Sequence, residues 1–71
     1  MLQTSLSTTL RTERKKRGFT QKQFAALANI PLPTYQRYES SAREPNWTQI
    51  SQIAAALNMT ISEFAERVEQ R

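Results

Sequence analysis

The segment from Phe19 to Glu39 constrains the fold of this chain more than any other part of the sequence. It contains two short runs with apolar residues at helical spacing, joined by the tight connection Asn29-Ile30-Pro31. Asn tolerates the positive φ that such a connection requires. Pro33 is accepted only in the first turn of a helix, where a backbone N–H has no helical partner to lose. The segment therefore predicts two short helices held at a sharp angle, over about residues 20–39.

The rest of the chain also predicts helices, because no strand-like alternation lasts long enough to compete. The first helix is expected from about Ser7 to Arg17, and Gly18 supplies the left-handed position that ends it. The fourth is expected from Asn46 to about Leu57, and the last over about residues 60–70. Capping boxes begin three of the helices: Thr20 with Gln23, Asn46 with Gln49, and Thr60 with Glu63. The sequence thus predicts an all-α fold of five helices in a single domain, residues 1–71.

The composition lacks the residues that several kinds of chemistry require. The 71 residues include no Cys and no His, so a structural zinc site, disulfides, thiol chemistry and imidazole catalysis are not expected. The carboxylates are scattered, and neither a nucleophile–base pair nor a glycine-rich phosphate loop is visible, so we expect no enzyme, cofactor or metal site. Residues 2–10 alternate Leu with Thr and Ser and lack an apolar run, which argues against a signal peptide or membrane span. We therefore expect a cytoplasmic protein with no membrane partner.

The charge of the chain favours an anionic partner, most simply nucleic acid. The net charge is +4, and residues 1–59 hold eight Lys or Arg against three Asp or Glu. Residues 60–71 hold two against three, so the C-terminal helix is nearly neutral and permits self-association. The basic run Lys15-Lys16-Arg17 is typical of a solvated helix end, and we expect it to attract DNA phosphates without sequence preference.

The order of residues along most of the chain is similar to that of a known family. The segment from Leu10 to Gln21, LRTERKKRGFTQ, resembles the opening of the lambda-repressor-like, Cro/C1-type (XRE) helix-turn-helix family. The resemblance covers roughly residues 6–64 and implies a five-helix lambda-repressor-like domain that binds double-stranded DNA, with its third helix in the major groove. Further landmarks follow in the family's order: Phe24-Ala25, Tyr35, Tyr38-Glu39, Arg43-Glu44-Pro45, Ile50, Ile53-Ala54 and Leu57.

The resemblance also implies structural roles for several residues. Arg14 and Glu39 match a pair that forms a salt bridge between the first helix and the end of the third. Tyr35 and Tyr38 match core positions that are more often aliphatic, so their hydroxyls are expected to reach towards the surface. Trp47 begins the fourth helix, and we favour packing against the domain over a dimer contact or a contact with the DNA backbone.

A set of DNA contacts is implied in the same way. Gln21 matches a phosphate-binding position, where free N–H groups and the helix dipole favour an anion, and Lys22 stands beside it. Leu32, Pro33 and Arg37 match base-reading positions. Leu32 and Pro33 offer only apolar contact, with helix-start packing as the alternative, whereas Arg37 can pair bidentately with guanine. The complete expected set is Gln21, Lys22, Leu32, Pro33, Thr34, Gln36, Arg37, Ser40 and Arg43.

Two functional hypotheses follow. Relatives normally bind palindromic DNA as two-fold dimers. We expect a homodimer whose seam, on the C-terminal helix and the connection before it, includes Met59, Ala65 and Val68, while Ile61 and Phe64 belong mainly to the core. The first hypothesis is a transcriptional repressor of the Cro-like, controller-protein-like or antitoxin-like kind. The chain ends shortly after the DNA-binding domain, so no small-molecule ligand is implied.

The alternative hypothesis is a protein-interaction module whose main role is to bind and neutralise a cognate toxin protein. Extra apolar surface beyond the dimer seam, around Trp47 or Leu32, would favour that alternative.

Overall fold

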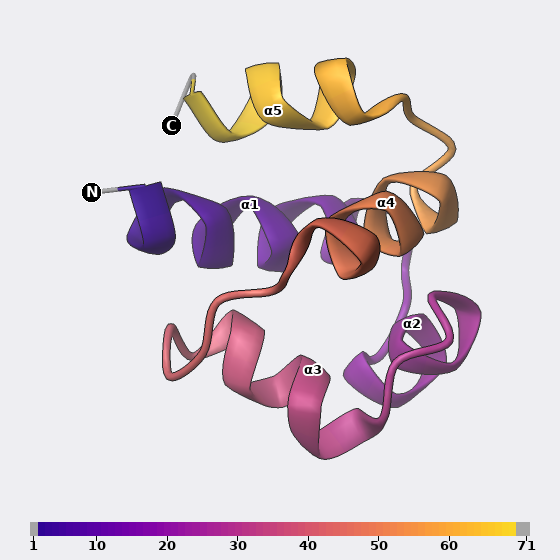
Figure 1. Ribbon diagram of the computed structural model, residues 1–71. Helices are drawn as coiled ribbons and strands as arrows, with labels where there is room; N and C mark the ends of the chain where they lie inside the picture. Colours follow the sequence, from indigo (N-terminus) through magenta and orange to yellow (C-terminus); the bar gives the residue numbers. More distant parts are fainter. Residues whose placement is uncertain (1, 70–71) are drawn as a thin grey trace.

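The structure is a computed structural model that describes residues 2–69, and this part of the chain contains helices and no strand (Figure 1). The all-α prediction with five helices is confirmed. Residue 70, the expected end of the last helix, lies outside the described residues, as do residues 1 and 71. None of the helices in the described range is long and apolar enough to cross a membrane. The helices are α1 Leu2–Lys16, α2 Gln21–Leu27, α3 Leu32–Glu39, α4 Trp47–Ala56 and α5 Ile61–Glu69.

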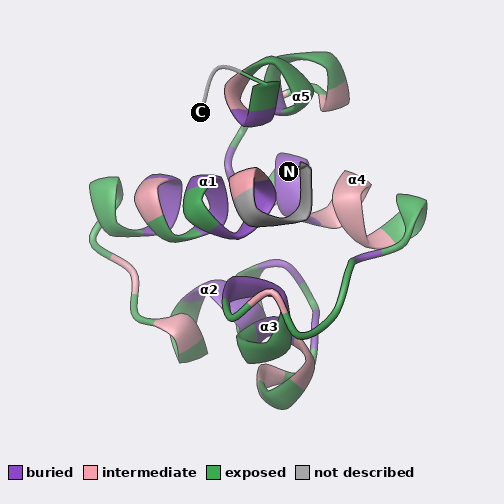
Figure 2. Cartoon of the chain, turned by 90° about the vertical axis from the view of Figure 1, so that its left-hand side faces the viewer, coloured by how far each residue is buried: buried purple, intermediate pink, exposed green. Residues whose placement is uncertain are grey.

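Helix α1 is the central element of the fold. It contacts α3 on one side and α5 on another, while α2 packs on α3 and α4 on α5. In Figures 1 and 2, α5 lies at one end of the molecule and α2 with α3 at the opposite end. The pair α2–α3 is therefore held on the body of the domain through α1. The buried core draws on α1, α2, α3, α4 and α5, and its largest fully buried apolar side chains are Leu10, Phe24, Tyr35, Tyr38, Ile53, Leu57 and Phe64.

The helix boundaries follow from local signals in the sequence. Thr20 and Asn46 are N-caps whose side chains accept from the backbone N–H three residues later, and both capping boxes are complete. Thr60 and Glu63 bond each other's backbone N–H groups in the same way, at 3.0 and 2.8 Å. Gly18 has φ of 76°. The expected turn before α3 is also confirmed, because residue 29, an Asn, has φ of 60°.

Helix α1 begins at Leu2, earlier than the expected start at Ser7. Ser and Thr have modest helix propensity, because their hydroxyls compete for backbone groups. In the fold, the Thr9 hydroxyl donates to the carbonyl of Ser5 at 2.8 Å. Leu6 is buried in the core together with Val68 of α5. Burial of this apolar face therefore extends the helix beyond what propensity indicates.

Candidate nucleic-acid interface

Helix α3 has one side in the core and the other in solvent. Tyr35, Tyr38 and Glu39 are buried, and no side chain caps the amino end of the helix at Pro31. Figure 2 shows α3 at one end of the molecule with exposed residues on its outer side. We use the name outer face of α3 for the three exposed residues of the helix, Pro33, Gln36 and Arg37, together with its exposed C-cap residue Ser40.

The two other expected base contacts at the start of α3 are half-buried. Leu32 packs partly against the core, so helix-start packing accounts for some of its surface. Thr34 is also half-buried, whereas Pro33 between them is exposed. Leu32 and Thr34 therefore border the outer face and expose only part of their surface.

Cations flank the outer face. Lys22 in the first turn of α2 is exposed, and Arg43 is exposed in the loop after α3. That loop folds back on the helix: the backbone N–H groups of Ala42 and Arg43 both donate to the carbonyl of Arg37, at 2.9 and 3.2 Å. The fold therefore holds the backbone of Arg43 beside that of Arg37, within one hydrogen-bonded turn.

A buried carboxylate connects α1, α2 and α3. The Arg14 guanidinium donates from Nε to Glu39 Oε2 at 2.7 Å and from Nη2 to Oε1 at 3.2 Å. Gln21 Nε2 donates to Oε1 at 3.0 Å, and the Tyr35 hydroxyl donates to Oε2. The Arg14–Glu39 salt bridge that the resemblance implies is thus present, with side chains only 10% and 4% exposed. Because α3 ends at Glu39, this network fixes the orientation of α3 on the body of the domain.

The same network keeps Glu39 ionised. Burial acts to raise the pKa of Glu39, but the hydrogen bonds from Arg14, Tyr35 and Gln21 outweigh it and hold the pKa below its usual value of 4.5. A buried carboxylate with these donors remains an anion at neutral pH. Its charge is balanced by Arg14, whose Nη1 also donates to the carbonyl of Phe19 at 2.8 Å.

The two tyrosines differ from the sequence-based expectation. Their hydroxyls do not reach the surface, because Tyr35 and Tyr38 are 0% and 1% exposed. Tyr35 donates to Glu39, and Tyr38 donates to the side-chain oxygen of Gln49 at the start of α4. Burial, followed by the hydrogen bond to Glu39, raises the pKa of Tyr35, and burial raises that of Tyr38. A buried tyrosine can satisfy its hydroxyl inside the core, which the sequence could not reveal.

Gln21 joins the first turn of α2 to α3. Besides its bond to Glu39, its Oε1 accepts from Gln36 Nε2 at 3.5 Å on the outer face. The side chain is half-buried. The structure therefore brings Gln21 and Gln36 together, and part of the hydrogen-bonding capacity of Gln21 is used inside the protein.

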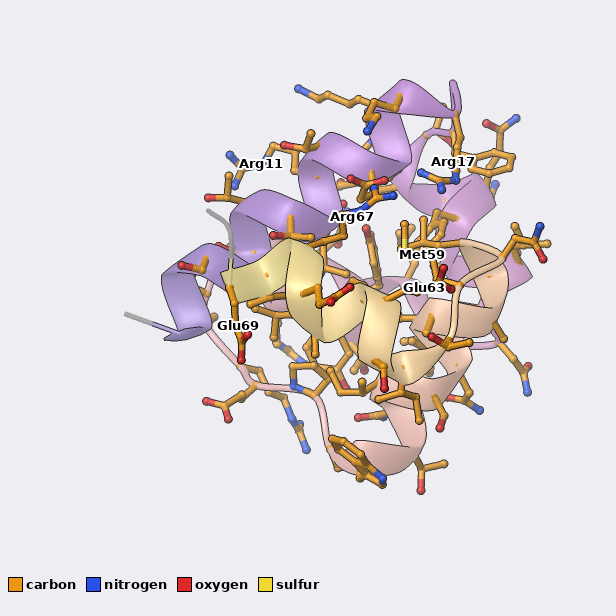
Figure 3. All side chains as sticks on the ribbon, turned by 90° about the horizontal axis from the view of Figure 1, so that it is seen from above. Arg11, Arg17, Met59, Glu63, Arg67 and Glu69 are labelled. Atoms are coloured by element: carbon orange, nitrogen blue, oxygen red, sulfur yellow. The ribbon has the colours of Figure 1, made fainter. Side chains whose placement is uncertain are left out.

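Arg17 does not belong to a freely exposed basic run. Its Nη1 donates to Glu13 Oε1 at 2.8 Å and its Nη2 to the carbonyl of Leu57 at 3.1 Å. Arg67 of α5 reaches the other oxygen of Glu13 at 3.1 Å. Figure 3 shows Arg17 and Arg67 pointing into the space between α1 and α5. These bonds give Arg17 a structural role that the sequence-based expectation did not include, and its expected role in attracting phosphates stays a prediction. Lys15 and Lys16 remain exposed.

Glu13 is a buried charge that the sequence pattern did not single out. Glu13 is 0% exposed. Burial acts to raise the pKa of Glu13, but the hydrogen bond from Arg17 and the charges of Lys16 and Arg67 hold it below 4.5. The spacing of Glu13 and Arg17, one helical turn apart, was a signal for this ion pair. The partner Arg67 could be found only in the fold.

Arg11 is a second residue that the sequence pattern did not single out. Its Nη2 donates to the backbone carbonyl of Glu39 at 3.0 Å. A cation at the carboxyl end of a helix satisfies a free carbonyl and complements the helix dipole. Arg11 thus holds the end of α3 from α1, beside the salt bridge of Arg14.

Two expectations on the far side of the domain need correction. Val68, expected at a dimer seam, is 5% exposed and belongs to the core of this chain. Trp47, expected to pack, is 71% exposed. Of the other expected seam residues, Met59 is half-buried against the core and Ala65 is exposed. The helical spacing of α5 could not tell which apolar residues face α1 and which face solvent.

The acid–base behaviour of the two buried carboxylates gives a testable prediction. Both pKa values are lower in the fold than the usual 4.5, so each group stabilises the fold above pH 4.5 and this contribution is lost as the pH falls through its folded pKa. We expect the free energy of unfolding to fall on acidification below about pH 4.5. Urea unfolding at a series of pH values measures this. Glu39→Gln should make the free energy of unfolding fall less steeply with decreasing pH. Glu66→Gln, the change of an exposed glutamate, serves as the control and should leave this dependence unchanged. A slope unchanged by Glu39→Gln would contradict the assignment.

The geometry defines a class of protein. Two short helices joined by a tight turn, the second with an exposed face flanked by cations and anchored through a buried salt bridge, form a helix-turn-helix DNA-binding domain. Within the part of the chain that the structure describes, no three or more His, Cys, Asp or Glu side chains come together in an arrangement that could hold a metal ion. The helix-turn-helix family model matches residues 10–68, so the chain belongs to the Cro/C1-type (XRE) helix-turn-helix family.

Solved structures share the fold. The clp gene regulator ClgR from Corynebacterium glutamicum superposes with a TM-score of 0.87 and 17% identity, over 99% of this chain and 74% of that chain. A second ClgR structure from C. glutamicum gives a TM-score of 0.86 and 17% identity, over 99% of this chain and 90% of that one. At this identity the likeness concerns the fold alone. No curated protein matches the sequence significantly.

Proposed function

We propose that this protein, a DNA-binding transcriptional regulator by family, is a sequence-specific repressor that binds palindromic operator DNA as a homodimer. The observation that carries the proposal is the outer face of α3, where Arg37 is exposed while the opposite side of the helix is locked to the body through Glu39. A rigidly held helix can present the same side chains to each half-site. Proteins of this class are not usually enzymes.

The proposed contacts divide into two groups. Gln21, Lys22, Ser40 and Arg43 contact phosphates on either side of the groove. Arg37 is the main base-reading residue, because its fork of donors matches the guanine edge. The base-reading set is completed by Leu32, Pro33, Thr34 and Gln36. Phosphate contacts set the register of the domain on DNA, and base contacts set the sequence.

Selection of bound sequences from a random pool of duplex DNA tests this proposal. The expected product is a palindrome whose half-sites are about one helical turn apart, as for two-fold dimers of this class. Binding to the selected DNA should weaken steeply with added salt, because Lys22 and Arg43 displace counterions from phosphates. The proposal would be contradicted if the selection yielded no common sequence. It would also be contradicted if the affinity did not change with salt concentration.

The proposed homodimer uses α5 and the connection before it. With Val68 in the core, the candidate residues that remain from the expected seam are Met59 and Ala65. Val68→Asp would place a charge in the core and unfold the chain, so it cannot report on association.

Met59→Asp provides the better test of the seam. We expect it to shift the mass in sedimentation equilibrium towards the monomer, because a charge on an apolar seam opposes association. Met59→Leu keeps the apolar character and should leave the mass unchanged, and thermal unfolding of both variants checks the fold. If Met59→Asp leaves a dimer intact, the seam lies elsewhere.

A second candidate function, a module that binds and neutralises a toxin protein, is favoured by one observation. Trp47 provides exposed apolar surface outside the DNA contacts. Co-purification with the product of a neighbouring gene, lost in Trp47→Ala and kept in Leu27→Ala, would support that function.

A further inference from the structure

Trp47 borders an apolar groove that no proposed DNA contact lines. The groove has a volume of about 270 Å³ and is formed by residues of α1, α4, α5 and the loop before α4. Its apolar lining includes Trp47 and Ile50 of α4 and Ile61 of α5. We call it the Trp47 groove. Trp47 is 71% exposed and lies beside this groove. Interaction hot spots have the same arrangement, in which an aromatic side chain adjoins a pocket.

The charges in the groove are of one sign. Glu44 and Glu69 line it, and no Lys or Arg does. Within the described part of the chain, neither carboxylate takes part in an ion pair. The groove is thus a locally acidic site on a chain whose net charge is +4. Charge complementarity therefore selects an occupant that carries Lys or Arg next to apolar side chains.

A second copy of this chain fits the groove poorly. In a two-fold interface the same patch faces itself. The carboxylates of Glu44 and Glu69 would then approach those of the partner without a lining cation between them, and such like-charge juxtaposition is costly. Of the two remaining seam candidates, Ala65 lines the groove and Met59 does not, so the proposed homodimer rests on Met59 and the groove is left to another occupant.

We propose that the Trp47 groove docks a short segment of a different protein, one with apolar side chains flanked by Lys or Arg. The apolar side chains pack against Trp47, Ile50 and Ile61, and the basic groups meet Glu44 and Glu69. Removing the indole and the apolar lining from water drives binding, and the paired charges set the specificity. The proposed DNA-binding function does not depend on this site, because its contacts lie on α2, α3 and the loop up to Arg43.

Trp47 is the one tryptophan of the sequence, so its fluorescence reports on the groove directly. The probe is a synthetic amphipathic helical peptide with leucine on one face and lysine on the other, and its counterpart carries glutamate in place of lysine. The lysine peptide should change the Trp47 emission and bind more tightly than the glutamate peptide. Equal binding of the two peptides, or no binding of either, overturns the proposal.

Matched variants locate the binding. Combined Glu44→Gln and Glu69→Gln should weaken the lysine peptide about tenfold, as expected for the loss of two surface charge pairs. Glu66→Gln, on an exposed position of α5 outside the groove, should leave the affinity unchanged. In calorimetry, Trp47→Ala should weaken binding and Leu27→Ala, the change of an exposed leucine on α2, should not. Insensitivity to the groove variants overturns the proposal.

Two further measurements separate the possible occupants and functions. If Trp47→Ala converts a dimer to a monomer and the lysine peptide does not bind, the occupant is a second copy and the proposal is wrong. Operator binding by Trp47→Ala, measured in parallel, tests the DNA-binding function on its own. Peptide binding lost in Trp47→Ala while operator binding persists supports the docking site as a separate function.

Discussion

Replacing Arg37 with Ala should weaken binding to the selected operator far more than binding to random DNA. Arg37 is exposed on the outer face of α3 and is the proposed guanine reader. A bidentate contact of this kind contributes about 1–3 kcal/mol of discrimination at each half-site, about 5- to 150-fold in affinity. The side chain makes no described contact that supports the core, so the fold should survive. Electrophoretic or anisotropy titrations with operator and random duplexes measure the effect.

The matched control for Arg37 is Lys22→Ala. Lys22 is also exposed but stands at the start of α2, where we propose a phosphate contact. Its removal should weaken binding to all DNA sequences equally. It should also reduce the slope of log affinity against log salt concentration by about one. If Arg37→Ala behaves like Lys22→Ala, with equal losses on operator and random DNA, then Arg37 contacts phosphate and does not read a base.

Replacing Arg14 with Met should cost the fold about 3–5 kcal/mol, because it leaves the buried carboxylate of Glu39 without its cation. The two side chains are 10% and 4% exposed, so solvent screens the pair little. Tyr35 and Gln21 still donate to the carboxylate, but neither carries a charge. A small domain has only about 5–15 kcal/mol of stability to lose. Urea unfolding measures the free energy, and DNA binding should fall in parallel as α3 loses its anchor.

A second substitution distinguishes a stranded charge from lost packing. Glu39→Gln added to Arg14→Met removes the uncompensated charge and should recover much of the lost stability, because a neutral amide is easier to bury than an unpaired carboxylate. An exposed pair would lose only about 0–1 kcal/mol on Arg14→Met. A loss of that size would show that water reaches the pair, contrary to its burial in the structure.

Local signals in the sequence account for most of the helix boundaries. The capping boxes at Thr20, Asn46 and Thr60 act within a single turn, so their hydrogen bonds depend on residues three positions apart. The same holds for Gly18 and Asn29, whose positive φ angles end one helix and turn the chain before the next. Such features need no partner from elsewhere in the chain, and the sequence predicts them.

The candidate site was only partly accessible from sequence. The period of α3 separates Arg37 and Gln36 from the buried tyrosines, and the family resemblance identifies the Arg14–Glu39 pair. The convergence of Tyr35 and Gln21 on Glu39 depends on three helices meeting at one point. The bonds from Arg11 to the carbonyl of Glu39 and from Arg17 to the carbonyl of Leu57 were missed because these acceptors are distant in sequence.

The sequence by itself determined the helical class, the turn between α2 and α3, and the solvent-facing side of α3 that carries Pro33, Gln36 and Arg37, because these depend on the residue period and on hydrogen bonds within one turn. Only the tertiary structure decided that α1 starts at Leu2, that Val68 is core and that Trp47 is exposed. These outcomes depend on how α1, α4 and α5 pack, since burial is a property of the neighbours that a side chain meets and not of its position along a helix.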